Sequence, residues 1–354
     1  MPIAGFEDRE SHRTPFASAG RCYCFGHCKQ LQEQTVRLRG QNSTQVGNEF
    51  LLNCPGSSFM AKRTFDFVQL DVFTTRPLEG NQLAVFTDAR GLSEEEMQKL
   101  ARETNLSETT YILPRDKTIE QREGIKVRIF TVNEELPFAG HPTLGTAWYL
   151  RQHSLAGEIV LDLKVGKVPV RFEHRDNSLF GEMRQMDPRF GPAHPHADVA
   201  KVLGVPVSEL DESLPIQSVS TGMWFTMVPF RSLATLQKLN VSWHQMAAYL
   251  QPFGDNSFFY LVSRETVSPD ATLHARMIFY NGEDPATGSA AGCCAAWSVR
   301  HGVLASDQSG LIEQGIETRR PSSIYIRAEK RGDAITNVRV GGHVVQIING
   351  TVTM

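Results

Sequence analysis

Three side chains able to carry protons stand at positions that suggest chemistry: Glu108, His141 and Asp284. A carboxylic acid held among apolar groups has a raised pKa, which suits it to take and return a proton near neutral pH. Histidine titrates in the same range and serves as an acid, a base or a hydrogen-bond donor. Brought together at a domain interface, His141 and Asp284 would make a proton-handling pair.

Glu108 lies in a segment with the composition of a strand, residues 106–113. Because side chains alternate between the two faces of a strand, Glu108 shares a face with Leu106 and Ile112. Those aliphatic neighbours would raise the pKa of the carboxyl group. The alternative is an edge strand in which Glu108 faces water, and the pattern alone leaves both interpretations open.

His141 and Asp284 occupy matching positions in two similar segments, residues 140–147 and 283–290. Aligned without gaps, Pro142, Gly145, Thr146 and Ala147 fall on Pro285, Gly288, Ser289 and Ala290. Proline is favoured at the first helical position, and small residues after it allow another backbone or a ligand to approach closely. Two related helix starts predict a duplicated domain with a site between the copies, although Pro-x-x-Gly helix starts are common enough to match by chance.

Each helix start is also a potential anion site. Free N–H groups and the positive end of the helix dipole attract a carboxylate or phosphate, and two facing helix starts would hold one small anion. Asp284 has a structural alternative, because Asp before a proline is an ordinary N-cap. Ser289, about one turn inside the second helix, is either a substrate contact or simply a small helix residue.

Local patterns predict the elements that would position these residues. Strands are expected at residues 65–73 and 81–86, and Ser93 begins a capping box that opens a helix. The helix that begins at Pro142 carries almost no charge, so it is expected to be buried on all sides within a sheet, and a second apolar helix is expected from Pro285 to Val299. Further strands are expected near residues 216–228, 258–262, 275–279 and 323–352. The order predicts two similar α+β halves.

The length of 354 residues allows about two domains. Residues 1–60 are rich in Ser, Gln, Asn, Gly and Arg without a sustained period, so we predict a disordered extension there. The predicted halves are residues 61–180 and 181–354, with the last strands packing back on the first half. A start at Met60 is one alternative for the extension, and a mitochondrial presequence, which the early acidic residues disfavour, is another.

Composition excludes several classes of protein. The chain is 41% hydrophobic and 21% charged with a net charge of -3, which argues against nucleic-acid and anionic-membrane partners. No apolar run approaches the ~20 residues that span a bilayer, so a cytoplasmic location is expected. The cluster from Cys22 to Cys28 lacks a second ligand pair, so no metal is expected, with zinc as the alternative. Cys293 and Cys294 are expected to be small buried hydrophobes.

Several motifs resemble the PhzF-like phenazine-biosynthesis family. They are residues 81–85 (Asn-Gln-Leu-Ala-Val), 105–110, 136–145 and 283–292, with shorter matches at 313–315 and 320–322. The resemblance runs from about Phe65 to the end of the sequence. It implies the diaminopimelate-epimerase-like fold, in which two pseudo-symmetric halves each curl a mostly antiparallel sheet around a central apolar helix, and it implies a homodimer.

The resemblance also implies a cofactor-independent isomerase that moves a proton between carbons of a small carboxylated metabolite. It assigns the general acid/base to Glu108 and proton assistance or substrate positioning to His141 and Asp284. The residues expected to bind the substrate are Gly140, Thr143, Gly288 and Ser289. Relatives in the superfamily use two cysteines at the helix starts, which this chain lacks, so two-thiol racemisation is not expected. The alternative function is a protein-interaction module that has kept the fold without turnover.

Overall fold

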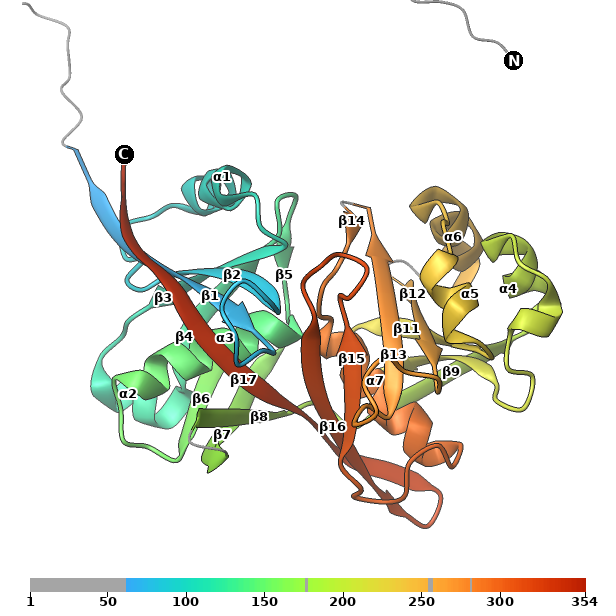
Figure 1. Ribbon diagram of the computed structural model, residues 1–354. Coiled ribbons are helices and arrows are strands. Elements are labelled where there is room, and N and C mark those ends of the chain that lie inside the picture. The colour runs from blue at the N-terminus through green and yellow to red at the C-terminus, as the bar shows by residue number, and fades with distance from the viewer. Residues whose placement is uncertain (1–61, 176–177, 254–256, 281) are drawn as a thin grey trace, which may run out of the picture. The chain divides into compact units, whose positions relative to one another are not determined.

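The computed structural model describes residues 62–175, 178–253, 257–280 and 282–354, and the predicted extension at 1–60 lies outside them. The described residues form seven α-helices and seventeen β-strands that are joined into one hydrogen-bonded sheet (Figure 1). The fold is therefore of the α+β class, as predicted. Within the described residues, no helix is both long enough and apolar enough to cross a bilayer.

The first eight strands surround the first long apolar helix. They are β1 (Thr64–Val72), β2 (Asn81–Phe86), β3 (Glu108–Leu113), β4 (Ile125–Phe130), β5 (Glu135–Leu136), β6 (Glu158–Leu163), β7 (Gly166–Arg175) and β8 (Ser178–Arg184). The helices among them are α1 (Glu94–Thr104), α2 (Lys117–Glu123) and α3 (Gly140–Gln152). Helix α3 is almost free of charge, so its burial leaves few charged groups without water. Residues 140–147 are all buried, and the helix contacts β1, β2, β3, β6, β7 and β8.

The remaining strands surround the second apolar helix. They are β9 (Arg189–His194), β10 (Ile216–Ser220), β11 (Trp224–Phe230), β12 (Ser257–Ser263), β13 (Leu273–Phe279), β14 (Gly282–Glu283), β15 (Gly310–Gln314), β16 (Ser322–Arg331) and β17 (Ala334–Thr353). The helices are α4 (His196–Leu203), α5 (Leu233–Lys238), α6 (Trp243–Leu250) and α7 (Gly288–Arg300). Residues 288–299 of α7 are all buried, which agrees with the central apolar helix that the resemblance implies, and they pack on β10, β11, β16 and β17.

Strand β17 ties the two groups of strands together. Its later residues pair antiparallel with the whole of β1, from Val72 opposite Val344 to Thr64 opposite Thr353. Its earlier residues pair with β16 on one side and β8 on the other. Figure 1 shows β17, in red, running from the strands around α3 toward those around α7. The two apolar helices are therefore covered in part by one continuous strand.

The two apolar helices begin at different points of the aligned motif, which corrects the prediction that each starts at its proline. Helix α3 begins at Gly140, two residues before Pro142, whereas α7 begins at Gly288, three residues after Pro285. The cause is Gln314, whose amide donates to the carbonyl of Asp284 (2.8 Å) and accepts from the backbone nitrogen of Thr287 (3.1 Å). These contacts hold the backbone before α7 in a non-helical path.

The starts of α3 and α7 touch through their backbones. A Cβ added at Gly140 would lie 2.5 Å from the carbonyl carbon of Gly288 and 2.5 Å from the nitrogen of Ser289. Beside them the ring of Phe73 would lie 3.0 Å from a Cβ at Gly288. Phe73 is fully buried and adopts a left-handed backbone conformation, with φ at 67°. A phenylalanine in that region stores strain of roughly 1–3 kcal/mol, so the surrounding packing must hold it there.

This contact generates a stability prediction for Gly140→Ala. The added methyl group meets backbone atoms that cannot rotate away, so the free energy of unfolding should fall by roughly 1–3 kcal/mol. The matched control is Gly157→Ala, because nothing lies within 4 Å of a Cβ at Gly157. That control should stay within about 0.5 kcal/mol of wild type in chemical denaturation. Equal stability for the two variants would contradict the close contact.

Candidate active site at the meeting point of two helix starts

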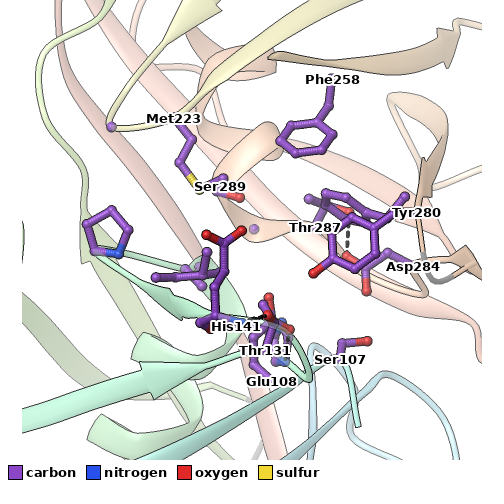
Figure 2. A pocket seen from close by; sticks show the side chains of 18 of the residues that line it. Ser107, Glu108, Thr131, His141, Met223, Phe258, Tyr280, Asp284, Thr287 and Ser289 are labelled. Atoms are coloured by element: carbon purple, nitrogen blue, oxygen red, sulfur yellow. Dashed lines mark hydrogen bonds and ion pairs between the residues drawn. The ribbon is translucent and has the colours of Figure 1, made fainter. Parts of the chain in front are cut away.

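A cavity of about 320 Å³ opens where α3 and α7 begin. Residues from both groups of strands line it, including Ser107, Glu108, Thr131, Gly140, His141, Met223, Trp224, Phe258, Phe279, Tyr280, Asp284, Thr287, Gly288 and Ser289. Figure 2 shows Met223 and Phe258 on one side of the cavity and Glu108, Thr131 and His141 on the other. One wall is therefore mainly apolar, and the other holds groups that can exchange protons.

The cavity brings together six of the seven residues that the sequence singled out. Glu108, His141, Asp284, Gly140, Gly288 and Ser289 all line it. Thr143 is not among the lining residues, since its side chain is fully buried and its hydroxyl donates to the carbonyl of Ala139 (2.6 Å). Thr143 therefore closes the first turn of α3 rather than facing the cavity.

Glu108 is the first residue of β3, which is an interior strand. It pairs in parallel with β2, where Leu83 lies opposite Glu108, and antiparallel with β4. The edge-strand alternative is therefore wrong. The side chain of Glu108 is only 15% exposed. Burial, and in second place the charge of Asp284, raises the pKa of Glu108 well above its ordinary value.

His141 is the second residue of α3, and it is 3% exposed. Burial lowers the pKa of His141 to about 3, so the ring is neutral near neutral pH. Its Nε2 lies 3.6 Å from Oε2 of Glu108, which is too long for a hydrogen bond, and has no other partner among the described residues. A buried ring nitrogen without a partner costs stability, and one that faces a cavity is placed to meet a ligand.

Asp284 lies just before α7 and is 7% exposed. Its Oδ1 accepts from Nδ2 of Asn81 (2.7 Å), and its Oδ2 accepts from Oγ1 of Thr287 (2.7 Å). Burial raises the pKa of Asp284 to about 7, while the hydrogen bonds from Thr287 and Asn81 act in the opposite direction. The N-cap interpretation of Asp284 is wrong, because the residue before α7 is Thr287.

The helix starts supply the means to hold an anion. The first N–H groups of α3 and α7 have no partner within their helices, and none of the residues that line the cavity is Lys or Arg. A negatively charged ligand would therefore be held by backbone N–H groups and helix dipoles. Ser289, which is the second residue of α7 rather than one turn inside it, adds a hydroxyl at the same place.

Sequence reasoning missed two parts of the site. One is Asn81, whose buried amide contacts both His141 and Asp284. The other is the wall formed by Met223, Trp224, Phe258, Phe279 and Tyr280, which come from different strands and turns. No local pattern marks these residues, because they become neighbours only when β11, β12 and β13 lie side by side. The motif at residues 81–85, which begins with Asn81, was the sequence feature that could have pointed to the role of Asn81.

Thiol chemistry does not fit this site. Cys293 and Cys294 are fully buried, and burial raises the pKa of each to about 12. Thiolates, the reactive form, are therefore scarce near neutral pH. The described residues also contain no cluster of three or more His, Cys, Asp or Glu side chains that would hold a metal ion.

Comparisons with known proteins place the chain among isomerases. A family profile for phenazine biosynthesis-like proteins, PhzC-PhzF, matches residues 70–350. An uncharacterized isomerase of Mesorhizobium japonicum is 35% identical over 302 residues, which cover 81% of this chain and 98% of that protein. The trans-2,3-dihydro-3-hydroxyanthranilate isomerase of Pseudomonas chlororaphis is 35% identical over 293 residues, which cover 81% and 99% respectively.

Solved structures agree with this placement. The phenazine biosynthesis protein of the PhzF family from Bacillus anthracis is 27% identical, with a TM-score of 0.74 over 82% of this chain and 100% of that one. A hydroxyproline epimerase from Agrobacterium vitis is 13% identical, with a TM-score of 0.56 over 82% of this chain and 91% of that one. The second likeness shows a shared fold and nothing more.

The raised pKa of Glu108 generates a pH-dependent stability prediction. A carboxyl group whose pKa is raised on folding loses its stabilising contribution as the pH rises through the folded pKa. Glutamine does not ionise, so the Glu108→Gln variant does not lose stability in this way. The free energy of unfolding of Glu108→Gln minus that of wild type should therefore be larger at pH 8 than at pH 5. The expected gain is about 1.4 kcal/mol for each pH unit by which folding raises the pKa.

The matched control is Glu135→Gln, measured by the same chemical denaturation. Hydrogen bonds from Arg128 lower the pKa of Glu135, so this carboxylate stabilises the fold above its ordinary pKa. Glu135→Gln should therefore be less stable than wild type at pH 8, the opposite sign. A Glu108→Gln advantage that does not change with pH would show that Glu108 titrates normally.

Proposed function

This chain belongs to the PhzC-PhzF family of phenazine biosynthesis-like proteins and is an isomerase, and we propose that it moves a proton between two carbons of a small unsaturated carboxylate without a cofactor. Glu108 is the general acid and base in this proposal. His141 and Asp284 assist it, and Gly140, Gly288 and Ser289 hold the substrate. Thr143 contributes through the first turn of α3.

The observation that carries the proposal is the pair of buried carboxyl groups beside an imidazole whose Nε2 has no hydrogen-bond partner among the described residues. Glu108 and Asp284 face the same cavity, and neither forms an ion pair with Lys or Arg among the described residues. Asp284 receives hydrogen bonds from Asn81 and Thr287, which stabilise its anion, whereas no donor to Glu108 is found among the described residues. Two acids whose surroundings differ in this way take different roles. Glu108 is suited to transfer the proton, and Asp284 is suited to assist it.

The substrate carboxylate would lie against the starts of α3 and α7. Residues at both helix starts line the cavity, and backbone N–H groups fixed in a helix need little reorganisation when a negatively charged group binds beside them. The hydroxyl of Ser289 would add one donor. Because the N–H donors hold the substrate carboxylate in place, they would position the conjugated carbons for proton transfer with Glu108.

The proton transfer balances without any other reactant. The carboxylic acid of Glu108 gives its proton to one carbon of the conjugated system, where the electron pair of a double bond forms the new C–H bond. The carboxylate of Glu108 then takes a proton from a different carbon, and the electrons of that broken C–H bond form the new double bond. A raised pKa keeps the proton on Glu108 for the first step and makes its carboxylate a stronger base than an exposed one in the second step.

The apolar wall of the cavity supports a planar or cyclic unsaturated substrate. Phe258 packs edge to face on Phe279, with ring centroids 4.9 Å apart, and both rings line the cavity. Aromatic faces contact flat conjugated molecules well, and the volume of about 320 Å³ fits a small metabolite. The relative from Pseudomonas chlororaphis is named for a dihydro-hydroxyanthranilate, which is a compound of this kind.

The two groups of strands support our further proposal that the protein consists of two pseudo-symmetric halves. In the first group β4 pairs antiparallel with β5 and parallel with β6, and α3 lies between β5 and β6 in the chain. In the second group β13 pairs antiparallel with β14 and parallel with β15, and α7 lies between β14 and β15. A duplicated ancestor would account for this repeated plan. The homodimer stays a prediction.

The proposed function predicts isomerisation of at least one compound in a panel of small unsaturated carboxylates, including dihydro-hydroxyanthranilate-type dienes. The assay is run in D2O, and mass spectrometry measures the isomerised product and its deuterium content. Glu108→Gln should lower the rate by about 10² to 10⁴, because the amide cannot take a proton from carbon. Glu103→Gln, the same change at an exposed position in α1, should leave the rate unchanged. Absence of product across a broad panel would favour the interaction-module alternative.

A second prediction concerns metal ions. Because Glu108 supplies the base and the helix starts stabilise the anion, dialysis against a chelator should leave the isomerisation rate unchanged. The measurement compares the initial rate before dialysis, after dialysis, and after addition of Mg²⁺ or Zn²⁺. A loss that added metal restores would overturn the cofactor-free part of the proposal.

A further inference from the structure

Asn81, the first residue of β2, is 1% exposed and lies between the two helix starts. Its Nδ2 is 2.7 Å from Oδ1 of Asp284, 2.8 Å from the carbonyl oxygen of Ala286 and 3.2 Å from Nδ1 of His141. One side-chain amide from the first group of strands therefore meets both assisting residues and the backbone that leads to α7.

The three contacts compete for two hydrogens. An asparagine amide nitrogen carries two hydrogens and no acceptor. The two shorter contacts, to Asp284 and Ala286, take both of them. At the longer distance of 3.2 Å, Nδ1 of His141 receives at most a shared hydrogen from Asn81. Asn81 therefore donates its two hydrogens to Asp284 and to the segment before α7, and it contacts the ring of His141.

The hydrogen bond from Asn81 gives the two buried acids different surroundings. Asp284 accepts from Asn81 at one oxygen and from Thr287 at the other, so its anion is stabilised at both atoms. The hydroxyl of Thr287 is itself oriented, because Nε2 of Gln314 donates to Oγ1 of Thr287 (2.9 Å). Glu108 has no such donors among the described residues. The hydrogen bonds therefore favour negative charge on Asp284 and the proton on Glu108.

We propose that Asn81 is a positioning residue that determines which of the two buried acids is ionised, by donating to Asp284 and holding the backbone before α7. The inference deepens the proposed function and rests on it for its catalytic consequence. With Asp284 kept as the anion, Glu108 starts each cycle as the group that exchanges a proton with the substrate. Without Asn81, the two acids would compete for one proton.

The other titratable groups around Asp284 come from four elements. They are Glu108 on β3, His141 on α3, Glu283 on β14 and Tyr260 on β12. Glu283 is held by Arg276 through two hydrogen bonds of 2.8 and 2.7 Å. The oxygen of Tyr260 donates to Gln314. The hydrogen bonds of Glu283 and Tyr260 do not involve Asn81, so its replacement removes neither of them, and we expect a change in the titration of Asp284 to report the loss of the Asn81 donor.

The test is a carbon NMR titration of protein labelled at its aspartate carboxyl carbons, without substrate. The Asp284 signal is assigned by its absence from Asp284→Asn. In Asn81→Leu, which keeps the size of the side chain and removes the donor, the titration midpoint of Asp284 should rise by about one pH unit. Asn81→Asp, which keeps the shape and adds a second carboxyl group beside Asp284, should raise it further.

The matched control is Gln185→Met. Gln185 is another buried amide, and its Nε2 donates to the carbonyl of Gly288 at the start of α7 (2.9 Å), but it is hydrogen-bonded to neither acid. Its substitution should leave the midpoint of Asp284 unchanged. A shift as large in Gln185→Met as in Asn81→Leu would show that general loosening of α7 causes the effect, and this outcome would overturn the proposal.

Kinetics supply the second readout. With any compound that the wild-type protein isomerises, Asn81→Leu should lower kcat by roughly 10²-fold with a much smaller change in KM, because the substrate is held elsewhere. The pH at half-maximal kcat should move together with the NMR midpoint. An unchanged midpoint of Asp284 in both Asn81 variants would overturn the inference even if the isomerase is active. A shifted midpoint with no compound isomerised would instead overturn the proposed function and leave the positioning role of Asn81 in place.

Discussion

The direct contact between the starts of α3 and α7 is the constraint on which the rest of the site depends. Two helices that meet through their N-termini bring two positive dipole ends together, and only glycine at position 140 allows the backbones to come so close. Negative charge nearby offsets the repulsion between these ends. Asp284, the acid whose anion is stabilised by hydrogen bonds from Asn81 and Thr287, would supply it, and a bound carboxylate would add to it. The same geometry that binds an anion therefore also accommodates the buried acids.

Burial makes these groups useful and also makes them costly. Asp284 and Glu108 have raised pKa values and His141 has a lowered one, because burial disfavours every charged form. The left-handed Phe73 adds strain directly beside Gly288. Such costs are tolerated where they serve activity, and they are offset by the extensive apolar core around α3 and α7. Several energetically costly groups of the fold thus lie around one small cavity.

Features that depend on neighbours in sequence were predictable, and features that depend on distant residues were not. The capping box at Ser93 and strand β2 are confirmed, because side chains a few residues apart determine them. The buried character of α3 followed from its lack of charge. The start of α7 was wrong because Gln314, in β15, binds the backbone before it. The aromatic wall and the role of Asn81 needed strand pairings that no local pattern reveals, and the short helix α2 has no buried face to mark it.

The span of β17 has a consequence for how the protein folds as it is synthesised. β17 is the last strand in chain order, yet it pairs with β1, the first. Thr64 can therefore pair with Thr353 only after nearly the whole chain has been synthesised. A ribosome must therefore release almost the whole described chain before the strands around α3 gain their last partner. Pairings between such distant residues form slowly, because a long loop must close first. Until then the unpaired edges of β1 and β8 would be open to wrong partners, so we expect assistance from chaperones to matter most during this interval.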